Sequence, residues 1–225
     1  MNGKQAAGYL AADWVKDGMT VGLGTGSTAY WAIERLGQRV AEGLLIQAIA
    51  TSSASEELAR KYHIPMIEAA QVDRLDLAID GADEVDHELQ LIKGGGGALL
   101  REKLVALQAD HFIVVADDSK KVDQLGVFKL PIEIVPFSYE WTLRKLRSLY
   151  PADFQLRQQD TNQLYVTDNG NYIVDAAFGR IEDAALLAQE LDHVTGVVEH
   201  GLFIDITQTL VLGFADGHTE VIEKK

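Results

Sequence analysis

Two carboxylates stand three residues apart after an apolar run in the first half of the chain. They are Asp80 and Asp83, in the sequence Asp-Gly-Ala-Asp-Glu at residues 80–84. Such a pair can transfer protons, hold the hydroxyl groups of a substrate or bind a metal ion. A metal site would need more ligands nearby; His87 and Glu88 are possible, but we interpret them as surface residues. Aspartates also form turns, so the pair alone does not assign a function.

A glycine-rich loop near the N-terminus has the residues that bind an anion. Residues 22–28 read Gly-Leu-Gly-Thr-Gly-Ser-Thr and are followed by a helical pattern at 29–40. A strand that leads through such a loop into a helix directs several N–H groups and the positive end of the helix dipole at one point. The loop departs from the dinucleotide fingerprint at Ser27 and lacks the Gly-Lys of a nucleotide-triphosphate loop, which favours a small phosphate monoester. A tight turn with capping hydroxyls explains the loop alone equally well.

Four consecutive glycines follow Lys93 and lead into a predicted helix at 98–108. Because glycine carries a large conformational entropy cost, we interpret this run as a backbone that approaches a ligand closely, with Lys93 as the neighbouring cation. At about 100° per residue, Glu102 faces away from the leucines at 100, 104 and 107, which we expect to pack in the core. Taken alone, Glu102 is more simply a solvated glutamate.

A fourth loop, Asp-Asp-Ser-Lys at residues 117–120, places Lys120 after another predicted strand. Taken singly, Lys120 would be a surface lysine. Parallel strands bring the loops at their carboxyl ends to one edge of a sheet, which is the usual place of α/β active sites. The four loops together therefore predict a site for a small phosphorylated and hydroxylated ligand.

Strands and helices alternate through the first half of the chain, which predicts a parallel sheet covered on both faces. We expect a doubly wound, Rossmann-like α/β domain. Its first helix is expected to end near Gly18, and one further helix is expected at 53–62. The expected strands are 19–23, 44–50, 65–67, 75–79, 89–92 and 111–116.

The second half has the order β-α-β-β-α-β, which is typical of a ferredoxin-like α+β domain. An extended segment at 131–136 precedes a helix at 139–149, and a second helix is expected at 182–191. Between them, strands at 163–166 and 171–175 are expected to form a hairpin, because Asp-Asn-Gly is strong hairpin-turn chemistry. We therefore predict a Rossmann-like catalytic domain at 1–126 plus 201–225 and a small ferredoxin-like domain at 127–200.

Composition excludes several classes of protein. The 225 residues are 47% hydrophobic and 24% charged, as in ordinary globular proteins, and include no cysteine, so disulfides and cysteine nucleophiles are ruled out. The net charge of −14 disfavours nucleic-acid binding. No apolar run approaches about 18 residues, and the N-terminal residues lack the pattern of a secretory signal. We expect a soluble, cytoplasmic protein without membrane contact.

Taken together, the motifs resemble the type A family of ribose-5-phosphate isomerases. The resemblance rests on residues 22–28, 80–84, 93–98 (Lys-Gly-Gly-Gly-Gly-Ala), 101–103 (Arg-Glu-Lys), 118–120 (Asp-Ser-Lys), 166–171 (Val-Thr-Asp-Asn-Gly-Asn), 196–198 (Gly-Val-Val) and 201–203 (Gly-Leu-Phe). It implies interconversion of D-ribose 5-phosphate and D-ribulose 5-phosphate through an enediolate, in the pentose phosphate pathway, without a metal or organic cofactor. It also implies a homodimer or homotetramer, with the small domain as the place for the interface. Residues 204–225 match the family only loosely.

The resemblance also implies roles for individual residues. Glu102 would be the base that moves a proton between C1 and C2, with Asp80, Asp83 and Lys93 around the reacting oxygens. We assign the proton shuttle between the oxygens to Asp80 and hydroxyl positioning to Asp83, although these two roles could be exchanged. The residues expected to bind substrate and its phosphate are Thr25, Gly26, Ser27, Thr28, Asp80, Gly81, Ala82, Asp83, Lys93, Gly94, Gly95, Gly96 and Lys120.

Three other functions remain open at this point. An aminosugar-phosphate deaminase or isomerase on the same scaffold would keep the phosphate loop but is not expected to combine Asp80 and Asp83 with Lys93 and Glu102. A sugar-phosphate sensor would lose the base and would need a DNA-binding segment, for which the acidic chain gives no sign. A metal-dependent hydrolase that uses Asp80 and Asp83 would lose activity with a chelator.

Overall fold

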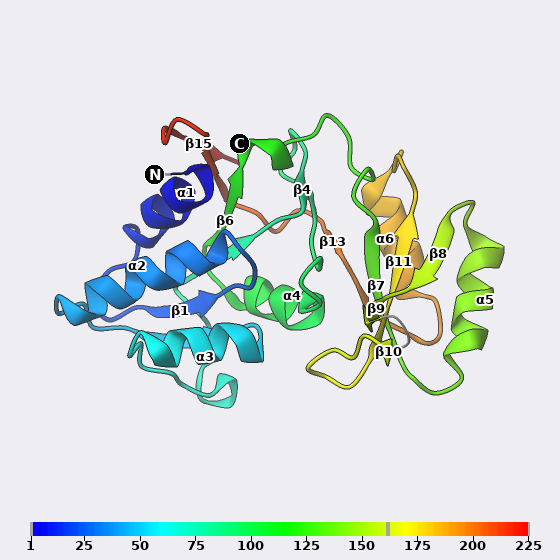
Figure 1. Ribbon diagram of the computed structural model, residues 1–225, viewed down its shortest axis with the longest axis horizontal. Helices are drawn as coiled ribbons and strands as arrows, with labels where there is room; N and C mark the ends of the chain where they lie inside the picture. The colour runs from blue at the N-terminus through cyan, green and yellow to red at the C-terminus, as the bar shows by residue number, and fades with distance from the viewer. Residues whose placement is uncertain (1, 161–162, 225) are drawn as a thin grey trace. The chain divides into compact units, whose positions relative to one another are not determined.

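The computed structural model describes residues 2–160 and 163–224. Its contacts divide the chain into two compact units, which we describe separately (Figure 1). The first unit comprises Met1–Ala82, Arg101–Lys121 and Asp205–Lys225, and the second comprises Asp83–Leu100 and Val122–Ile204.

These bounds differ from the expected division. Residues 83–100, 122–126 and 201–204 belong to the second unit rather than to the first. Two interactions explain the difference. The short strands β4 (Glu84–Val85), β5 (Leu91–Ile92) and β13 (Leu202–Phe203) form one sheet within the second unit. The buried carboxylate of Glu84 also accepts the backbone N–H groups of Gly126 (2.7 Å) and Phe128 (2.5 Å).

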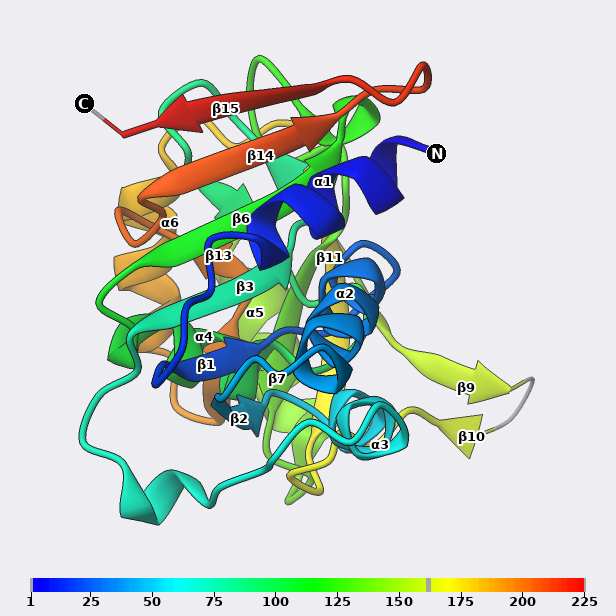
Figure 2. The same cartoon turned by 90° about the vertical axis from the view of Figure 1, so that its left-hand side faces the viewer.

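The first unit is the expected doubly wound α/β domain. Its six-stranded sheet has the order β15-β14-β6-β3-β1-β2, in which all neighbours are parallel except the antiparallel pair β14 and β15 (Figure 2). The strands are β1 (Thr20–Leu23), β2 (Gln47–Ala50), β3 (Leu77–Gly81), β6 (Phe112–Asp117), β14 (Thr209–Gly213) and β15 (Thr219–Glu223). The helices are α1 (Gly3–Ala12), α2 (Ala29–Ala41), α3 (Ser53–Lys61) and α4 (Leu99–Gln108, in the first unit from Arg101 on), with 3₁₀ turns η1 (Ala69–Gln71) and η2 (Asp118–Lys120).

Helices cover both faces of this sheet. Val21 and Leu23 of β1 pack in one buried cluster with alanines and aliphatic residues of α1 and α2, which lie in front of the sheet in Figure 2. Successive residues of a strand point to opposite faces, so Gly22 points to the other face. A Cβ atom at Gly22 would lie 2.5 Å from Cγ1 of Val105 on α4. Glycine at this position therefore lets α4 approach the strand closely.

The strand order contains a topological switch point. From β1 the chain crosses to β2 on one side, and it returns to add β3 and then β6 on the other side of β1. In sheets of this kind, ligands bind outside the carboxyl ends of the two strands at which the order reverses. Here those strands are β1 and β3, which are followed by the glycine-rich loop and by Asp80 at the end of its strand.

The sequence patterns misplace some elements of the first unit. The first helix ends at Ala12 and not near Gly18, whose positive φ of 85° belongs to the turn before β1. The expected strand at 65–67 is wrong, because this segment makes only a single bridge, between Ala48 and Met66. The helix at 53–62 is confirmed, with Ser52 as its N-cap: its side chain accepts the N–H of Ser55.

The ferredoxin-like fold expected for the second half of the chain is confirmed within the second unit. Its antiparallel sheet has the order β12-β7-β11-β8, and the chain passes through β-α-β-β-α-β (Figure 1). Leucines of both helices pack with residues of the sheet in one buried cluster. The elements are β7 (Leu130–Ile134), α5 (Tyr139–Leu149), β8 (Asp153–Leu156), β11 (Tyr172–Ala177), α6 (Ala184–Asp192) and β12 (Val197–His200).

The expected hairpin between 163–166 and 171–175 is wrong in its pairing. β11 pairs with β7 and β8, and the segment before the Asp-Asn-Gly turn meets it only through a bridge between Val166 and Tyr172. The short strand β10 (Gln163–Leu164) pairs instead with β9 (Gln158–Asp160). Turn chemistry predicts a reversal of the chain correctly, but the partners of a strand depend on the packing of the whole sheet.

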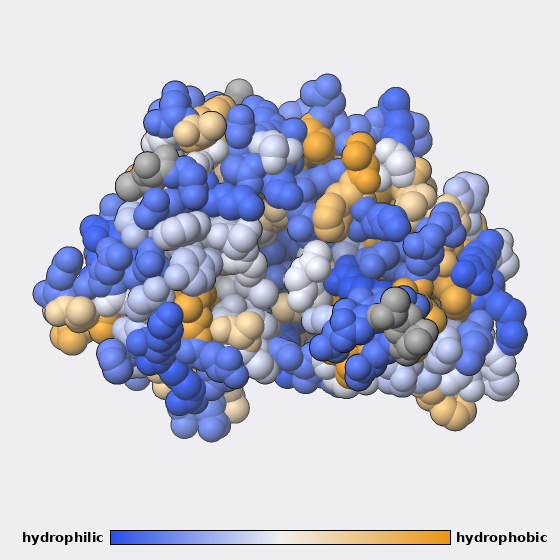
Figure 3. All heavy atoms as spheres, viewed as in Figure 1, coloured by the Kyte–Doolittle hydropathy of each residue, from blue (hydrophilic) through white to orange (hydrophobic). Residues whose placement is uncertain are grey.

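No helix within the described residues is long and apolar enough to cross a membrane. Hydrophilic residues cover much of the face shown in Figure 3, as the high content of acidic residues leads one to expect.

Candidate active site

The glycine-rich loop of the first unit is tied to the end of β3. The N–H of Gly24 donates to the carbonyl of Ile79 (2.8 Å), and the N–H of Thr25 donates to Oδ1 of Asp80 (2.9 Å). Asp80 is 2% exposed, and a Cβ atom at Gly24 would collide with its carboxylate. The same Oδ1 accepts the N–H of Gly81 (2.7 Å). Glycine is therefore required where the loop passes over the acid.

Thr25 has a structural contact that the sequence does not reveal. Its hydroxyl lies within 2.7 to 3.1 Å of the hydroxyls of Thr51, Ser52 and Ser55, which are all buried. Ser55 in turn donates to the carbonyl of Gly24 (2.7 Å). This hydroxyl cluster holds the loop in place.

The outer part of the loop leads into the N-terminus of α2. Gly26 has a φ of 113°, which favours glycine. Thr28 is the N-cap residue of this 13-residue helix, so the positive end of the helix dipole lies at the loop. Ser27 is exposed, and its Oγ accepts a hydrogen bond from Nζ of Lys4 (2.9 Å). An anion at this point would meet the helix terminus, a hydroxyl and an ammonium group.

Lys4 was missed by sequence reasoning. It lies in the first turn of α1, and its Nζ is also 3.9 Å from Asp117, at the end of β6. Asp117 caps η2, the turn that contains Lys120, by accepting the N–H of Ser119. Lys4 therefore links the loop after β1 with the loop after β6. A lone lysine in an amphipathic helix gives no sequence signal for such a role.

Glu102 lies in the first turn of α4 and is 3% exposed. The helix ends at Gln108, whose carbonyl accepts the N–H of Leu75, just before β3 begins. The first turn of α4 therefore lies toward the carboxyl edge of the sheet. Glu102 is one turn before Val105, which packs on Gly22. Ile79 belongs to the buried cluster with α1 and α2, so its neighbour Asp80 points to the opposite face of the sheet, on which α4 packs. Asp80 and Glu102 are thus two buried carboxyl groups on the same side of the first unit's sheet.

The predicted core face of this helix was wrong. Leu104 and Leu107 are each 57% exposed, whereas Leu99, Glu102 and Ala106 are buried. Helical spacing shows that two faces differ but does not show which of them meets the sheet. Here α4 packs closely on Gly22 through the face that holds Val105 and Glu102, and the carboxyl group of Glu102 is therefore buried.

The second unit holds the other predicted residues, beginning with Lys93. Lys93 is 2% exposed, and its Nζ lies 5.4 Å from the centre of the Phe203 ring, a cation–π distance. Its N–H donates to the carbonyl of Gly201 (2.8 Å). A Cβ atom at Gly201 would collide with the Lys93 carbonyl. The Gly-Leu-Phe motif at residues 201–203 therefore serves to place Lys93.

The glycine run after Lys93 forms a tight turn in which the N–H of Gly97 donates to the carbonyl of Gly94 (2.9 Å). Gly94 and Gly97 have positive φ values of 97° and 83°. The carboxylate of Asp83 accepts the N–H of Gly95 (2.7 Å). The second unit thus brings together the predicted residues Asp83, Lys93, Gly94, Gly95 and Gly96.

The Thr-Asp-Asn-Gly-Asn motif at residues 167–171 is hydrogen-bonded to the buried side chain of Glu133. Oε1 of Glu133, which is fully buried on β7, accepts hydrogen bonds from the side chains of Thr167 (2.9 Å), Asn169 (3.3 Å) and Asn171 (2.9 Å). The motif is therefore explained as the anchor of a loop.

One group of three side chains in the described part of the chain has the spacing of metal ligands. Asp192, Glu199 and His200 bring their ligand atoms within 4.8 Å of one another. Nδ1 of His200 accepts the N–H of Leu202 (3.2 Å), so its Nε2 carries the proton and donates to Asp192 (3.1 Å). This tautomer fits a hydrogen-bonded histidine and not a metal ligand. His87 and Glu88 are exposed and are not part of such a group.

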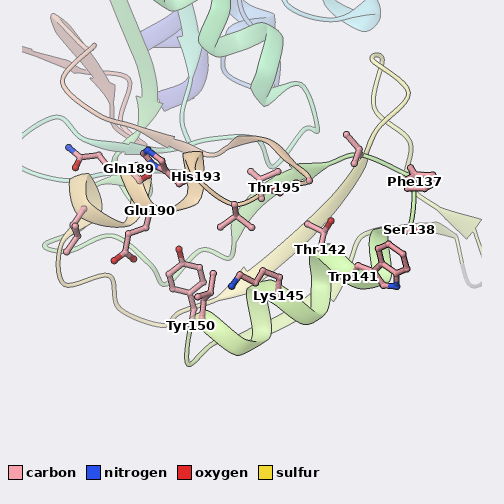
Figure 4. Close-up of a pocket in the computed structure, with 16 residues that line it drawn as sticks. Phe137, Ser138, Trp141, Thr142, Lys145, Tyr150, Gln189, Glu190, His193 and Thr195 are labelled. Atoms are coloured by element: carbon pink, nitrogen blue, oxygen red, sulfur yellow. Dashed lines mark hydrogen bonds between the residues drawn. The ribbon is translucent and has the colours of Figure 1, made fainter.

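A groove of about 1070 Å³ lies between α5 and α6 in the second unit (Figure 4). Trp141 and Lys145 of α5 line it together with Glu190 of α6 and His193. None of the residues predicted to bind substrate lines this groove.

Fold and site define the class of protein. The first unit is a doubly wound α/β domain in which a glycine-rich loop leads into a helix N-terminus and a buried carboxylate lies at the switch point, an arrangement that suits enzymes that act on small anionic substrates. The family profile described as ribose 5-phosphate isomerase A (phosphoriboisomerase A) matches residues 47–217.

Individual relatives match almost the whole chain. Ribose-5-phosphate isomerase A of Bacillus mycoides (strain KBAB4) is 51% identical over 221 residues, covering 98% of this chain and 99% of the relative. The structure of ribose 5-phosphate isomerase from Plasmodium falciparum superposes with a TM-score of 0.93 at 38% identity, covering 99% of this chain and 98% of that one. A D-ribose-5-phosphate isomerase in complex with phospho-erythronic acid has a TM-score of 0.94 at 39% identity, covering 99% and 100%. The chain belongs to the ribose-5-phosphate isomerase A family and is an isomerase.

Proposed function

We propose that this isomerase interconverts D-ribose 5-phosphate and D-ribulose 5-phosphate through an enediolate, with Glu102 as the base. The observation that carries the proposal is the buried carboxyl group of Glu102, which lies on the same side of the first unit's sheet as Asp80. A shift between an aldose and a ketose moves one proton between adjacent carbons, so a single carboxylate on a rigid helix suffices.

The proposed reaction moves one proton between two carbon atoms and another between two oxygen atoms. Glu102 removes the proton from C2 of the open-chain aldose, the electron pair of that bond forms the C1=C2 double bond, and O1 takes the negative charge. A proton then passes from O2 to O1, and Glu102 returns its proton to C1. Asp80 is our first choice for the transfer between the oxygens, and Asp83 for holding a hydroxyl group.

The charge that develops on the oxygens needs preorganised donors. We assign this role to Lys93 and to N–H groups of the glycine run, namely those of Gly94 and Gly96, because the N–H of Gly95 donates to Asp83. These assignments rest on the membership of the family.

The phosphate is proposed to bind at the loop from Thr25 to Thr28, with Lys120 and also Lys4 as cations. The contact between Lys4 and Ser27 supports this assignment. These local donors offset the net charge of −14, which repels an anionic substrate at long range. Binding energy from the phosphate, remote from C1 and C2, can orient the reacting end. The relative described above in complex with phospho-erythronic acid binds a phosphorylated sugar acid, which supports a phosphorylated sugar as the substrate here.

We further propose that the reaction uses neither a metal nor an organic cofactor, and that the protein acts in the cytoplasm as a homodimer or homotetramer. These proposals rest on the family and on the sequence.

Conversion of D-ribose 5-phosphate to D-ribulose 5-phosphate in the presence of EDTA tests the proposed function. We expect full activity with the chelator and little activity on unphosphorylated D-ribose. Loss of activity with EDTA, restored by a divalent metal, would contradict the metal-free mechanism. Binding of the sugar phosphate without turnover would indicate a sensor, and absence of binding would favour a different sugar-phosphate enzyme on the same scaffold.

A further inference from the structure

Three consecutive carbonyl groups of the glycine run are held by two side chains from the ferredoxin-like part of the second unit. Nη1 of Arg157 donates to the carbonyls of Gly94 (2.9 Å) and Gly95 (3.1 Å). The hydroxyl of Tyr165 donates to the carbonyl of Gly96 (3.3 Å). Neither Arg157 nor Tyr165 belongs to any motif that the sequence singles out.

Arg157 is itself fixed in position. Its Nε and Nη2 form a two-pronged ion pair with the carboxylate of Asp175 on β11, at 2.9 and 2.5 Å, and both side chains are less than one-fifth exposed. Its guanidinium carbon lies 5.8 Å from the centre of the Tyr165 ring. The backbone N–H of Tyr165 donates to the carbonyl of Arg157 (2.9 Å), which joins the two residues further. Arg157 therefore presents its remaining donor to the glycine run in a defined direction.

The hydrogen bonds from Arg157 to the carbonyls of Gly94 and Gly95 determine the direction of the N–H groups of Gly95 and Gly96. In a trans peptide, the carbonyl of one residue and the N–H of the next point in opposite directions. The Gly94 carbonyl faces Arg157, and the N–H of Gly95 accordingly points away and donates to Asp83 (2.7 Å). The carbonyl of Gly95 also faces Arg157, so the N–H of Gly96 points away from Arg157 as well.

We propose that Arg157, supported by Asp175 and Tyr165, is a positioning residue for the reaction: it orients the two peptide groups that join Gly94, Gly95 and Gly96, so that the N–H of Gly95 holds the carboxylate of Asp83 and the N–H of Gly96 faces the substrate oxygens. The inference rests on the proposed function, because it assigns the N–H group of Gly96 to the reacting oxygens. Without Arg157, four glycines in sequence would sample many conformations, and the donors would have to be ordered at the moment of reaction.

The substitution Arg157→Lys tests this proposal. Lysine keeps the positive charge but cannot form a bidentate ion pair with Asp175 and at the same time donate to the carbonyls of Gly94 and Gly95. We expect kcat to fall at least about tenfold, in line with the loss of preorganised donors, and KM to change less than about threefold. Tyr165→Phe removes only the donor to Gly96 and should give a smaller fall in kcat. Arg180→Lys is the matched control, since Arg180 forms an exposed ion pair with Glu182 in the same unit.

A second readout separates positioning from general stability and from the proposed function. The ¹H–¹⁵N signals of Gly95 and Gly96 in the free protein should shift in Arg157→Lys and stay unchanged in Arg180→Lys, with the melting temperature within a few degrees of wild type. A kcat within twofold of wild type, or unchanged glycine signals, would overturn the inference. So would a loss of activity that only follows a lowered melting temperature and recovers at low temperature. If the wild-type protein does not turn over D-ribose 5-phosphate, the proposed function has failed, and the glycine signals alone decide whether Arg157 orders the run.

Discussion

Oδ1 of Asp80 accepts the backbone N–H of Thr25 at 2.9 Å, which joins the end of β3 to the glycine-rich loop after β1. The same oxygen accepts the N–H of Gly81 at 2.7 Å. Asp80 therefore has a structural role, since one oxygen holds two backbone segments at the switch point of the sheet. The proposed mechanism adds a proton-transfer role for the same carboxyl group, and the two roles can be separated.

Asp80→Asn should abolish most of the activity while the loop stays in place. The amide oxygen of asparagine can accept both N–H groups, but the amide cannot carry a proton between O1 and O2. We expect kcat to fall about 10²- to 10⁴-fold, with a melting temperature close to that of wild type. Asp80→Ala is the comparison, because it leaves two buried donors unpaired and should cost about 1–3 kcal/mol for each of them. Retention of more than a tenth of the wild-type kcat in Asp80→Asn would remove Asp80 from the chemistry.

Lys4→Ala should weaken binding of the phosphate without changing the chemical step. Lys4 donates to Ser27 at the N-terminus of α2, and hydrogen bonds to charged groups contribute about 1.5–3 kcal/mol. We therefore expect KM for D-ribose 5-phosphate to rise at least about tenfold, with kcat within about threefold of wild type. Lys16→Ala, an exposed lysine beyond the end of α1, is the control. Equal KM values in the two variants would show that Lys4 does not contact the substrate.

Much of the site could be predicted because its signals are local in the sequence. The glycine-rich loop, the pair Asp80 and Asp83, and Lys93 each stand beside a strand or a glycine run that marks them. Lys4 and Arg157 could not be found in this way, because they act on residues 23 and about 60 positions away, and neither has a local signature.

The errors in the fold have a similar origin. Helical spacing separates the leucine face of α4 from the face of Glu102, but only packing on Gly22 decides that Glu102 is the buried one. The Asp-Asn-Gly turn is real, yet the strand that pairs with β11 comes from Asp153–Leu156 instead of from the adjacent segment. In both cases a long-range contact decides between alternatives that are equal locally.

The partly buried position of Asp86 predicts that the free energy of unfolding depends on pH. Burial raises the pKa of the Asp86 carboxyl above its usual value, although the N–H groups of Gln90 and Glu88 donate to it and lower the pKa in part. A raised pKa means that the folded state prefers the protonated form, so this residue stabilises the protein fully below about pH 3.8 and loses that contribution as the pH rises through the folded pKa.

Asp86→Asn should therefore be more stable than wild type at pH 7 and equally stable near pH 3, because the amide oxygen can still accept both N–H groups. Urea unfolding of the two proteins across this pH range measures the difference. A variant that is less stable than wild type at pH 7 would contradict the assignment.

The central claim, that Glu102 is the base, is tested most directly by Glu102→Gln. The measurement is kcat for isomerisation of D-ribose 5-phosphate, together with exchange of the C2 proton into D₂O and binding of D-ribose 5-phosphate by calorimetry. We predict that kcat and the exchange rate fall about 10²- to 10⁴-fold, while the Kd stays within a few-fold of the wild-type KM. A variant that still exchanges the C2 proton at a rate near that of wild type would show that another group is the base.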